Sequence, residues 1–327
     1  MHLAIKRQQL KSAMLPIAIV LGAVFYKWIG YLSFLSPYLI FVMLFVTYCK
    51  LNLSELKPKR AHLLLIAAQM ALCAAVYLLV VPWDSVVAEG LFICVFMPTA
   101  TAAPVVTAML GGSISFVATY SLLCNLVIAL AGPFVLAAIG EAGNLTFMQS
   151  TLMILSKVAP LLICPLIVAI IVRYATPNIH RTISEHQSLS FYLWTGALII
   201  IVGNCVSFVI NTWQPSHLPD ILMMVAGAML CCGVQYIIGR KIGASLNKSE
   251  RLLANPGGNS EIPDYRVSAA QSLMQKNTVI GVWLALTYMN SLASVAAAAY
   301  IAWHNLLNSW QLWRHERNKV SAKMKSN

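Results

Sequence analysis

Long apolar stretches recur along almost the whole chain and constrain its fold more than any other feature. Read with a window of about 19 residues, the sequence predicts ten membrane spans, at 13–28, 33–49, 61–81, 85–110, 114–139, 149–174, 188–210, 219–240, 265–288 and 290–311. Only 10% of the 327 residues are charged, whereas a soluble domain carries about 25%. Backbone groups inside a bilayer must be hydrogen-bonded within the chain, so the spans are expected to be helices. We therefore predict an all-α polytopic membrane protein that forms one transmembrane unit.

The basic residues are distributed unevenly between the two ends of the predicted spans. If the N-terminus is placed inside, the inner side receives all of the 22 lysines and arginines except Lys27, Lys157 and Lys276. This bias predicts cytoplasmic N- and C-termini, with residues 312–327 as a frayed cytoplasmic tail. We expect an integral protein of the plasma (inner) membrane, whose net charge of +12 reflects topology and attraction to anionic lipids rather than nucleic-acid binding.

The ten spans divide into two groups of five near residue 145, and the second group starts on the opposite side of the membrane. Such inverted repeats are typical of secondary transporters, which bind their substrate near the middle of the membrane between interrupted helices. The fourth span is interrupted by Pro98 and Pro104, and the ninth by the polar residues of 271–277. Lys276 lies roughly 16 Å from Tyr265 along a helix, near the centre of a bilayer, where a charge is costly. The sequence therefore predicts a site where these two spans are broken.

These two interrupted spans resemble those of the bile acid:sodium symporter family. In that family the fourth helix carries a Pro-Gly-Gly-Thr-Ala-Ser-Asn type motif, and the ninth carries a Glu-x-Gly-Met-Gln-Asn type motif. The corresponding segments here are Pro98-Thr99-Ala100-Thr101-Ala102-Ala103-Pro104 and Gln271-Ser272-Leu273-Met274-Gln275-Lys276. The resemblance implies broken helices 4 and 9 that cross each other. It also implies a panel domain, over 13–49 and 149–210, and a core domain, over 61–139 and 219–311, with substrate bound between them.

The resemblance implies that the sodium sites are altered. The family's sodium-ligating glutamate falls on Gln271, and its Ser-Asn pair falls on Ala103 and Pro104. The candidate residues of vestigial coupling sites are Gln69, Ser121, Gln271, Met274 and Gln275. Sodium is a hard cation that needs several oxygen ligands, so we expect sodium coupling to be weakened or absent. Na+ and H+ both remain open as the coupling ion, and no other cofactor and no metal site is predicted.

The family's substrate-contacting asparagine falls on Lys276, or on Asn277 if one residue is inserted, and its threonine falls on Thr101. Thr99 and Asn305 are further candidates for substrate binding. A fixed ammonium at Lys276 is expected to attract a carboxylate or sulfonate, or to carry a proton as the site alternates. A third alternative is that Lys276 only bonds carbonyls freed by the helix breaks.

The predicted function is secondary active transport, by alternating access, of an organic anion that is bile-acid-like or a small carboxylate or sulfonate. Two alternatives stay open: a ligand sensor or receptor on the same fold, and a sodium-coupled symporter with non-standard ligands. An enzyme is not expected, because the sequence has no HExxH motif and no paired carboxylates or activated nucleophile within the spans. The sequence does not indicate an oligomeric state.

Overall fold

The computed structural model describes residues 14, 16–49, 57–100, 102–139, 147–186, 188–212, 215–253 and 263–326. These residues are almost entirely helical, and one isolated β-bridge is the exception. After a helix over Pro16–Val24, the elements are α2 (Tyr26–Ile29), η1 (Gly30–Leu35), α3 (Ser36–Tyr48), α4 (Arg60–Val80), α5 (Ser85–Phe96), α6 (Ala103–Met109), α7 (Ile114–Ile139), α8 (Phe147–Ala175), α9 (Pro177–Glu185), α10 (Ser188–Thr212), η3 (Pro215–His217), α11 (Leu218–Leu253), α12 (Tyr265–Met274), α13 (Thr278–Tyr288), η4 (Ser291–Ala293) and α14 (Ser294–Ser326).

Several helices expose large apolar side chains and bury polar ones, which is unusual in a soluble protein. On α4, Leu63, Leu64, Leu78 and Leu79 are exposed, whereas Gln69 is buried. Among the described residues, three helices are long and apolar enough to cross a membrane, or five if each sharply bent helix pair counts as one span. The all-helical class and the apolar, membrane-type helices are thus confirmed, and the count of ten spans stays a prediction.

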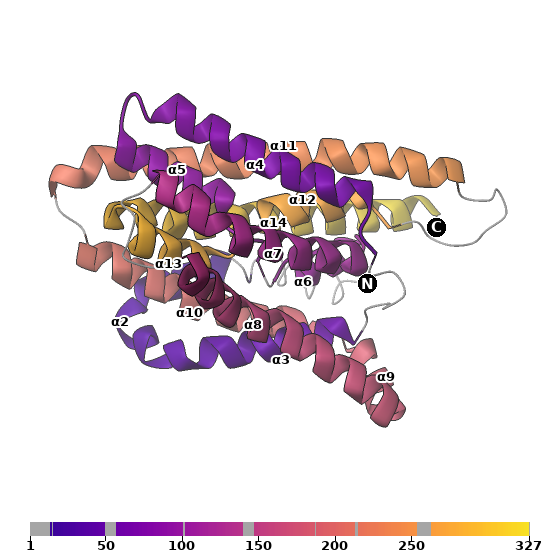
Figure 1. Cartoon of the computed structure of the whole chain (residues 1–327). Coiled ribbons are helices and arrows are strands. Elements are labelled where there is room, and N and C mark those ends of the chain that lie inside the picture. Colours follow the sequence, from indigo (N-terminus) through magenta and orange to yellow (C-terminus); the bar gives the residue numbers. More distant parts are fainter. Residues whose placement is uncertain are drawn as a thin grey trace.

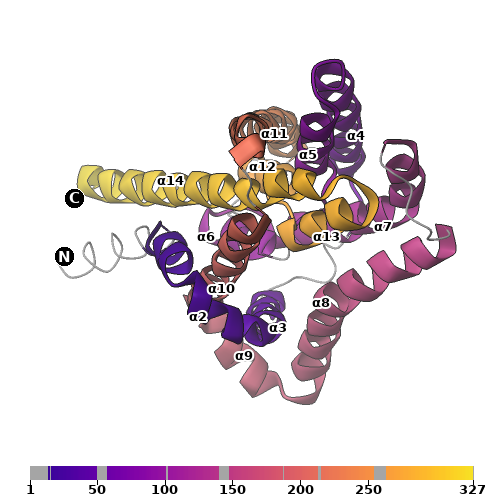
Figure 2. The same ribbon diagram turned by 90° about the vertical axis from the view of Figure 1, so that its left-hand side faces the viewer.

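The helices form two groups that lie side by side (Figures 1 and 2). One group contains α2, α3, α8, α9 and α10, and the other contains α4, α5 and α11 to α14. Within the first group, the Thr47 hydroxyl of α3 lies 3.1 Å from the Ser190 hydroxyl of α10. The Ser33 hydroxyl of η1 donates to Asn204 Oδ1 of α10 at 2.8 Å. One buried and one half-buried polar bond therefore tie α3 and η1 to α10, as expected where a bilayer supplies no hydrogen-bonding partners.

Two glycines, four residues apart, let α11 and α12 run very close together. A Cβ atom on Gly239 would lie 2.6 Å from the Ala269 carbonyl oxygen, and one on Gly243 would overlap the Tyr265 carbonyl. Small residues at this spacing are the usual means by which membrane helices approach each other. The contact fixes α12 against the long helix α11, and so fixes the place where α12 ends.

The start of α12 is tied to neighbouring helices by one carboxylate. Asp264 Oδ1 accepts hydrogen bonds from the Arg266 N–H and from Asn247 Nδ2 of α11, both at 2.9 Å. Burial alone would raise the pKa of the Asp264 carboxyl, but the hydrogen bonds from Arg266 and Asn247 outweigh it and hold the pKa below its ordinary value. The Asp264 N–H donates to the Gly111 carbonyl at 3.2 Å, and the His315 ring of α14 lies beside Gly111.

The starts of α4 and α12 and the ends of α11 and α14 therefore lie at one end of the molecule, on the right in Figure 1. The Lys59 ammonium lies 3.3 Å from the Tyr265 hydroxyl, which links the start of α4 to that of α12. We call this the basic end, because it also carries Arg60, Lys248, Arg266 and Arg314. It corresponds to the side on which the sequence predicts the cytoplasm.

Helix boundaries differ from the sequence prediction in three places, and one further helix is not predicted. The predicted gap at 29–32 is wrong, because Pro16–Val24 and Tyr26–Leu35 meet at an 86° bend and α3 follows directly. The predicted frayed tail at 312–327 is also wrong for its described part, since α14 stays helical to Ser326. Its Arg, Lys, Glu, Gln and Ala residues are strong helix formers and extend the helix beyond the apolar span. For the same reason α11 continues to Leu253. The short helix α9, which the hydropathy pattern does not predict, begins at Pro177 and carries an Arg181–Glu185 pair one turn apart.

Candidate functional site

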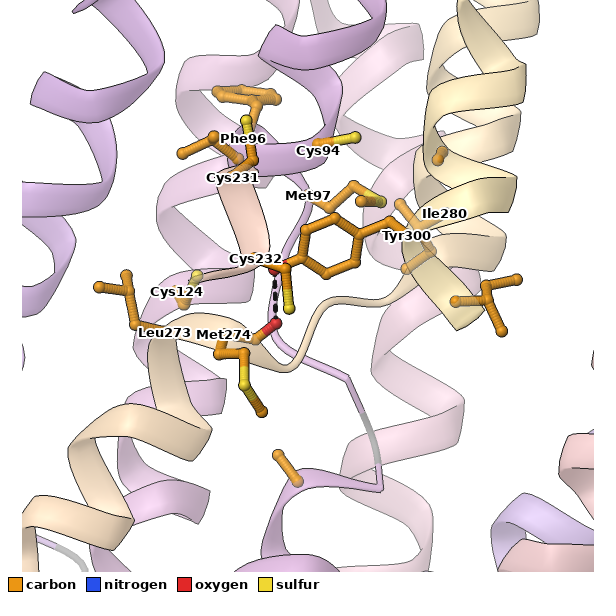
Figure 3. Close-up of a cluster of buried hydrophobic side chains, with 14 of the residues drawn as sticks. Cys94, Phe96, Met97, Cys124, Cys231, Cys232, Leu273, Met274, Ile280 and Tyr300 are labelled. Carbon is orange, nitrogen blue, oxygen red and sulfur yellow. Dashed lines mark hydrogen bonds between the residues drawn. The ribbon is translucent and has the colours of Figure 1, made fainter. Parts of the chain in front are cut away.

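The two interrupted spans are broken where the sequence predicts, and their breaks contact each other. The chain is not helical at residues 97–100, after α5, nor at residues 275–277, between α12 and α13, and the two segments pass each other in Figure 3. Thr99 and Lys276 form an antiparallel bridge. The Ala100 N–H donates to the Gln275 carbonyl at 2.9 Å, and the Asn277 N–H donates to the Pro98 carbonyl at 2.7 Å. Four half-helices thus end or begin at one crossing.

Proline explains the shape of the first break. A residue before proline is disfavoured in the α-helical region, and Met97 has φ −43° and ψ 140°. Pro98 therefore keeps Met97 out of the helix, so α5 ends at Phe96. Pro104 has the opposite effect because it lies in the first turn of α6, where a proline needs no hydrogen-bonding partner.

A glutamine held by a tyrosine satisfies the carbonyls that the first break frees. Gln69 Nε2, from α4, lies 3.3 Å from the Phe96 carbonyl oxygen and 3.2 Å from that of Met97. Gln69 Oε1 in turn accepts a hydrogen bond of 2.8 Å from the Tyr120 hydroxyl of α7. The Cys124 thiol approaches the same oxygen at 3.5 Å. A break without such partners would leave bare carbonyls in the membrane, at a cost of several kcal/mol each.

The same two residue types hold the second break. The Tyr300 hydroxyl of α14 donates to the Met274 carbonyl at 2.8 Å, the dashed line in Figure 3. Gln235 Nε2 of α11 donates to the Tyr300 hydroxyl at 3.0 Å and to the Cys231 carbonyl at 3.1 Å. Neither Gln235 nor the two tyrosines are among the residues that the sequence predicts for the site. We refer to Gln69–Tyr120 and Gln235–Tyr300 as the two clamps.

Lys276 is the one cation of the crossing, and its ammonium has no partner among the described residues. The residue is 1% exposed and its Nζ atom makes no hydrogen bond. The thiols of Cys73, Cys94 and Cys124 are within electrostatic range. The buried carboxylate of Glu89 on α5 accepts the Asn290 N–H at 2.8 Å. A buried ammonium without a counter-ion is costly, so it is suited to pairing with an anion.

The alternative in which Lys276 only bonds freed carbonyls is therefore not supported. The clamps already donate to the carbonyls of Phe96, Met97 and Met274. The Lys276 ammonium therefore remains available to pair with a ligand.

Other predicted substrate residues lie at or near the crossing. The Thr99 hydroxyl donates to the Ser272 carbonyl at 3.1 Å, so it also joins the two breaks. The Asn277 side chain caps α13 by accepting from the Ile280 N–H at 3.3 Å. Thr101 lies outside the described residues, and its role stays a prediction.

Asn305 lies one helical turn beyond Ile301 on α14. Its Nδ2 donates to the Ile301 carbonyl at 2.7 Å, and its buried Oδ1 has no partner among the described residues.

The residues predicted as vestigial sodium ligands mostly bond one another or the backbone. Gln271 Oε1 accepts from Gln275 Nε2 at 2.9 Å, and Met274 supplies its carbonyl to the Tyr300 clamp. Ser121 bonds Asn125 of the same helix: Asn125 Nδ2 donates to its carbonyl at 2.7 Å and lies 3.3 Å from its hydroxyl. Gln69 is committed to the first clamp. Within the described residues, no group of three or more His, Cys, Asp or Glu side chains could hold a metal ion.

Comparisons with protein-family models and with curated proteins find no match for this sequence. The function is therefore inferred from the chemistry of the crossing and from the motifs that carry the resemblance.

Proposed function

We propose that the protein is a secondary transporter of organic anions that works by alternating access, in the fold of the bile acid:sodium symporter family. The observation that carries this proposal is the buried, unpaired ammonium of Lys276 at the crossing of two broken helices. Broken helices that meet in this way are typical of transporter sites at the middle of the membrane. In the membrane, the basic end faces the cytoplasm.

The two clamps support an architecture of two inverted five-helix repeats. Gln69 and Tyr120 come from the third and fifth predicted spans, and Gln235 and Tyr300 come from the eighth and tenth. The same residue types thus serve corresponding spans of the two halves. The two helix groups of Figures 1 and 2 likewise support a panel domain and a core domain. In this arrangement the panel and core rock against each other around the crossing.

The helix ends at the crossing favour an anion. Helix N-termini carry a partial positive charge and C-termini a partial negative charge. The C-terminal carbonyls of α5 and α12 receive hydrogen bonds from the clamps, whereas α13 begins two residues after Lys276. The ammonium and this N-terminus therefore add up to a positive site. A carboxylate or sulfonate is the chemical group that complements it.

The same residues support a mechanism without sodium. Gln271 replaces a carboxylate, Ala103 and Pro104 supply no side-chain oxygens, and Gln69 is bonded within a clamp. Lys276 instead provides a positive charge that is part of the chain. Substrate affinity then comes from a resident cation rather than from a bound co-ion.

Uptake into proteoliposomes tests the proposal. We expect taurocholate, cholate or smaller carboxylates and sulfonates to accumulate without a sodium gradient. Lys276→Met should lose anion binding, whereas Lys57→Met, at an exposed lysine, should keep it. Equal anion affinity in Lys276→Met would show that the counter-ion role is wrong.

Two further results would favour the alternatives. Strict dependence on sodium would indicate a symporter with non-standard ligands. Saturable binding with no flux in either direction would indicate a sensor or receptor.

A further inference from the structure

Three cysteine thiols lie within electrostatic range of the Lys276 ammonium, and we call them the thiol wall. They belong to Cys73 on α4, Cys94 on α5 and Cys124 on α7. All three are free, and each residue is at most 2% exposed. Cys94 and Cys124 lie among the buried apolar side chains that surround the crossing in Figure 3. In the described part of the chain, no carboxylate is among the titratable groups that act on this ammonium.

The first clamp places two of these thiols on the same side of the site. Gln69 and Cys73 are one turn apart on α4, and Tyr120 and Cys124 are one turn apart on α7. Residues four apart share a helix face, so the faces that meet in the Gln69–Tyr120 bond also carry the two cysteines. The Cys124 thiol lies 3.5 Å from Gln69 Oε1. Along each helix, the cysteine is about 6 Å from the clamp residue.

The strong hydrogen-bonding groups beside the thiol wall are already occupied. Gln69 donates to the carbonyls of Phe96 and Met97 and accepts from the Tyr120 hydroxyl. Thiols bond only weakly, both as donors and as acceptors, and in packing they behave as small apolar groups. On the side formed by α4, α5 and α7, the Lys276 site therefore presents a charge next to a largely apolar surface.

We propose that the thiol wall selects anions whose charged group is attached to plain hydrocarbon, and that it disfavours anions with a hydroxyl close to the charge. The proposal rests on the function proposed above. The sulfonate or carboxylate pairs with the Lys276 ammonium, and the carbons attached to it lie against the thiols. A hydroxyl at this place gives up its bonds to water and meets only weak partners. The substrate class thus narrows to alkyl sulfonates and alkyl carboxylates.

Two sulfonates of the same shape test this selectivity. Propane-1-sulfonate and isethionate are both fully ionised, and they differ only in a methyl group or a hydroxyl at the same position. Their dissociation constants are measured by titrating the detergent-solubilised full-length protein. We expect propane-1-sulfonate to bind at least about tenfold more tightly, equivalent to about 1.4 kcal/mol. An apolar pocket can disfavour an added hydroxyl by about a hundredfold, so this ratio is within reach of a thiol-lined surface.

Variants of the cysteines locate the effect. Cys73→Ser keeps nearly the same shape but adds a hydroxyl that donates and accepts, so the ratio of the two dissociation constants should fall by about threefold or more. Cys73→Ala adds no hydroxyl, so the two affinities should change together. Cys164→Ser, at an exposed cysteine of α8, should keep the parent's ratio. Cys94→Ser provides a second test of the wall if Cys73→Ser fails to fold.

Three results would overturn the inference and leave the proposed function standing. Equal affinities of the parent protein for the two sulfonates would show that no apolar surface lies beside the charge. An unchanged ratio in both Cys73→Ser and Cys94→Ser would show that the hydroxyl is disfavoured elsewhere. Transport of cholate without binding of either sulfonate would show that the site does not take a short alkyl anion.

The proposed function has its own point of failure. It would fail, together with the inference, if none of the two sulfonates, cholate and taurocholate were bound or transported.

Discussion

Replacing Lys276 by methionine should stabilise the folded protein while it abolishes anion binding. The ammonium is buried and unpaired among the described residues. Methionine is also unbranched and similar in length, so it can follow the same path. The bonds that join the two breaks are made by the backbone of Ala100, Asn277 and their partners, and they remain. Removing the charge therefore removes a cost and breaks no bond.

The size of the effect follows from the absence of a partner. Replacing buried charged groups by apolar residues of similar volume often stabilises a protein by about 1–4 kcal/mol. At Lys276 no partner is left behind in the described structure, so we expect a gain of at least about 1 kcal/mol. For a chain of this length, that gain raises the melting temperature by about 2 °C or more.

The buried cysteines provide the assay. Cys49, Cys73, Cys94, Cys124 and Cys231 are free and buried, so a thiol-reactive dye that fluoresces on coupling reports unfolding of the detergent-solubilised protein during heating.

The exposed residue Lys57 provides the control, because Lys57→Met should change the free energy of unfolding by less than about 0.5 kcal/mol. A lower melting temperature in Lys276→Met than in the parent would refute the reasoning. It would mean that the ammonium makes stabilising bonds in the folded state.

Further predictions concern helix contacts, the second clamp and pH. Gly243→Ala should destabilise the folded protein by about 1–3 kcal/mol, because the added Cβ would overlap the α12 backbone. Gly233→Ala is the control, since its Cβ would meet open space and should not destabilise the protein. Equal melting temperatures of the two variants would contradict the close approach of α11 and α12. Tyr300→Phe should cost about 1–3 kcal/mol, since it leaves the Met274 carbonyl buried without its partner; an unchanged melting temperature would contradict the clamp. The lowered pKa of Asp264 means that its stabilising bonds are complete above the ordinary carboxyl pKa of about 3.9 and are lost as pH falls below it. Asp264→Asn should therefore lower the melting temperature more at pH 7 than at pH 3, and the same loss at both values would contradict this sign.

The two helix breaks could be predicted because their causes are local. Pro98 disturbs the backbone of Met97 whatever surrounds it, and a polar run such as 271–277 is costly in any apolar span. The pairing of Thr99 with Lys276 could not be predicted in the same way. It depends on how two spans 177 residues apart are placed, which neither hydropathy nor residue spacing specifies.

The two clamps could not be predicted from the sequence either. A single glutamine such as Gln69 or Gln235 in an apolar helix indicates that a polar partner exists, but not which one. Tyr120 and Tyr300 give no signal at all, because tyrosine is common in membrane helices and its hydroxyl reveals a role only when an acceptor lies beside it. The resemblance placed Gln69 near a coupling site. The structure adds that its amide holds the first break.

Hydropathy also fails to predict the end of a helix that continues beyond the membrane span. It marks residues that prefer lipid, whereas helix length depends on backbone propensity and on neighbouring helices. α14 therefore runs through 312–326, where charged residues with high helix propensity replace the apolar ones. The same difference explains why α11 passes the predicted end of its span at residue 240.

The residues at the crossing suit an anion better than a cation. A site that binds a cation needs free oxygens, yet the clamps occupy the carbonyls of Phe96, Met97 and Met274, and position 271 is an amide whose oxygen bonds Gln275. A carboxylate paired with Lys276 would neutralise its charge inside the protein, but the Lys276 ammonium has no partner among the described residues. The scarcity of free oxygens at the crossing is therefore the condition under which a lysine at this position can attract an anion.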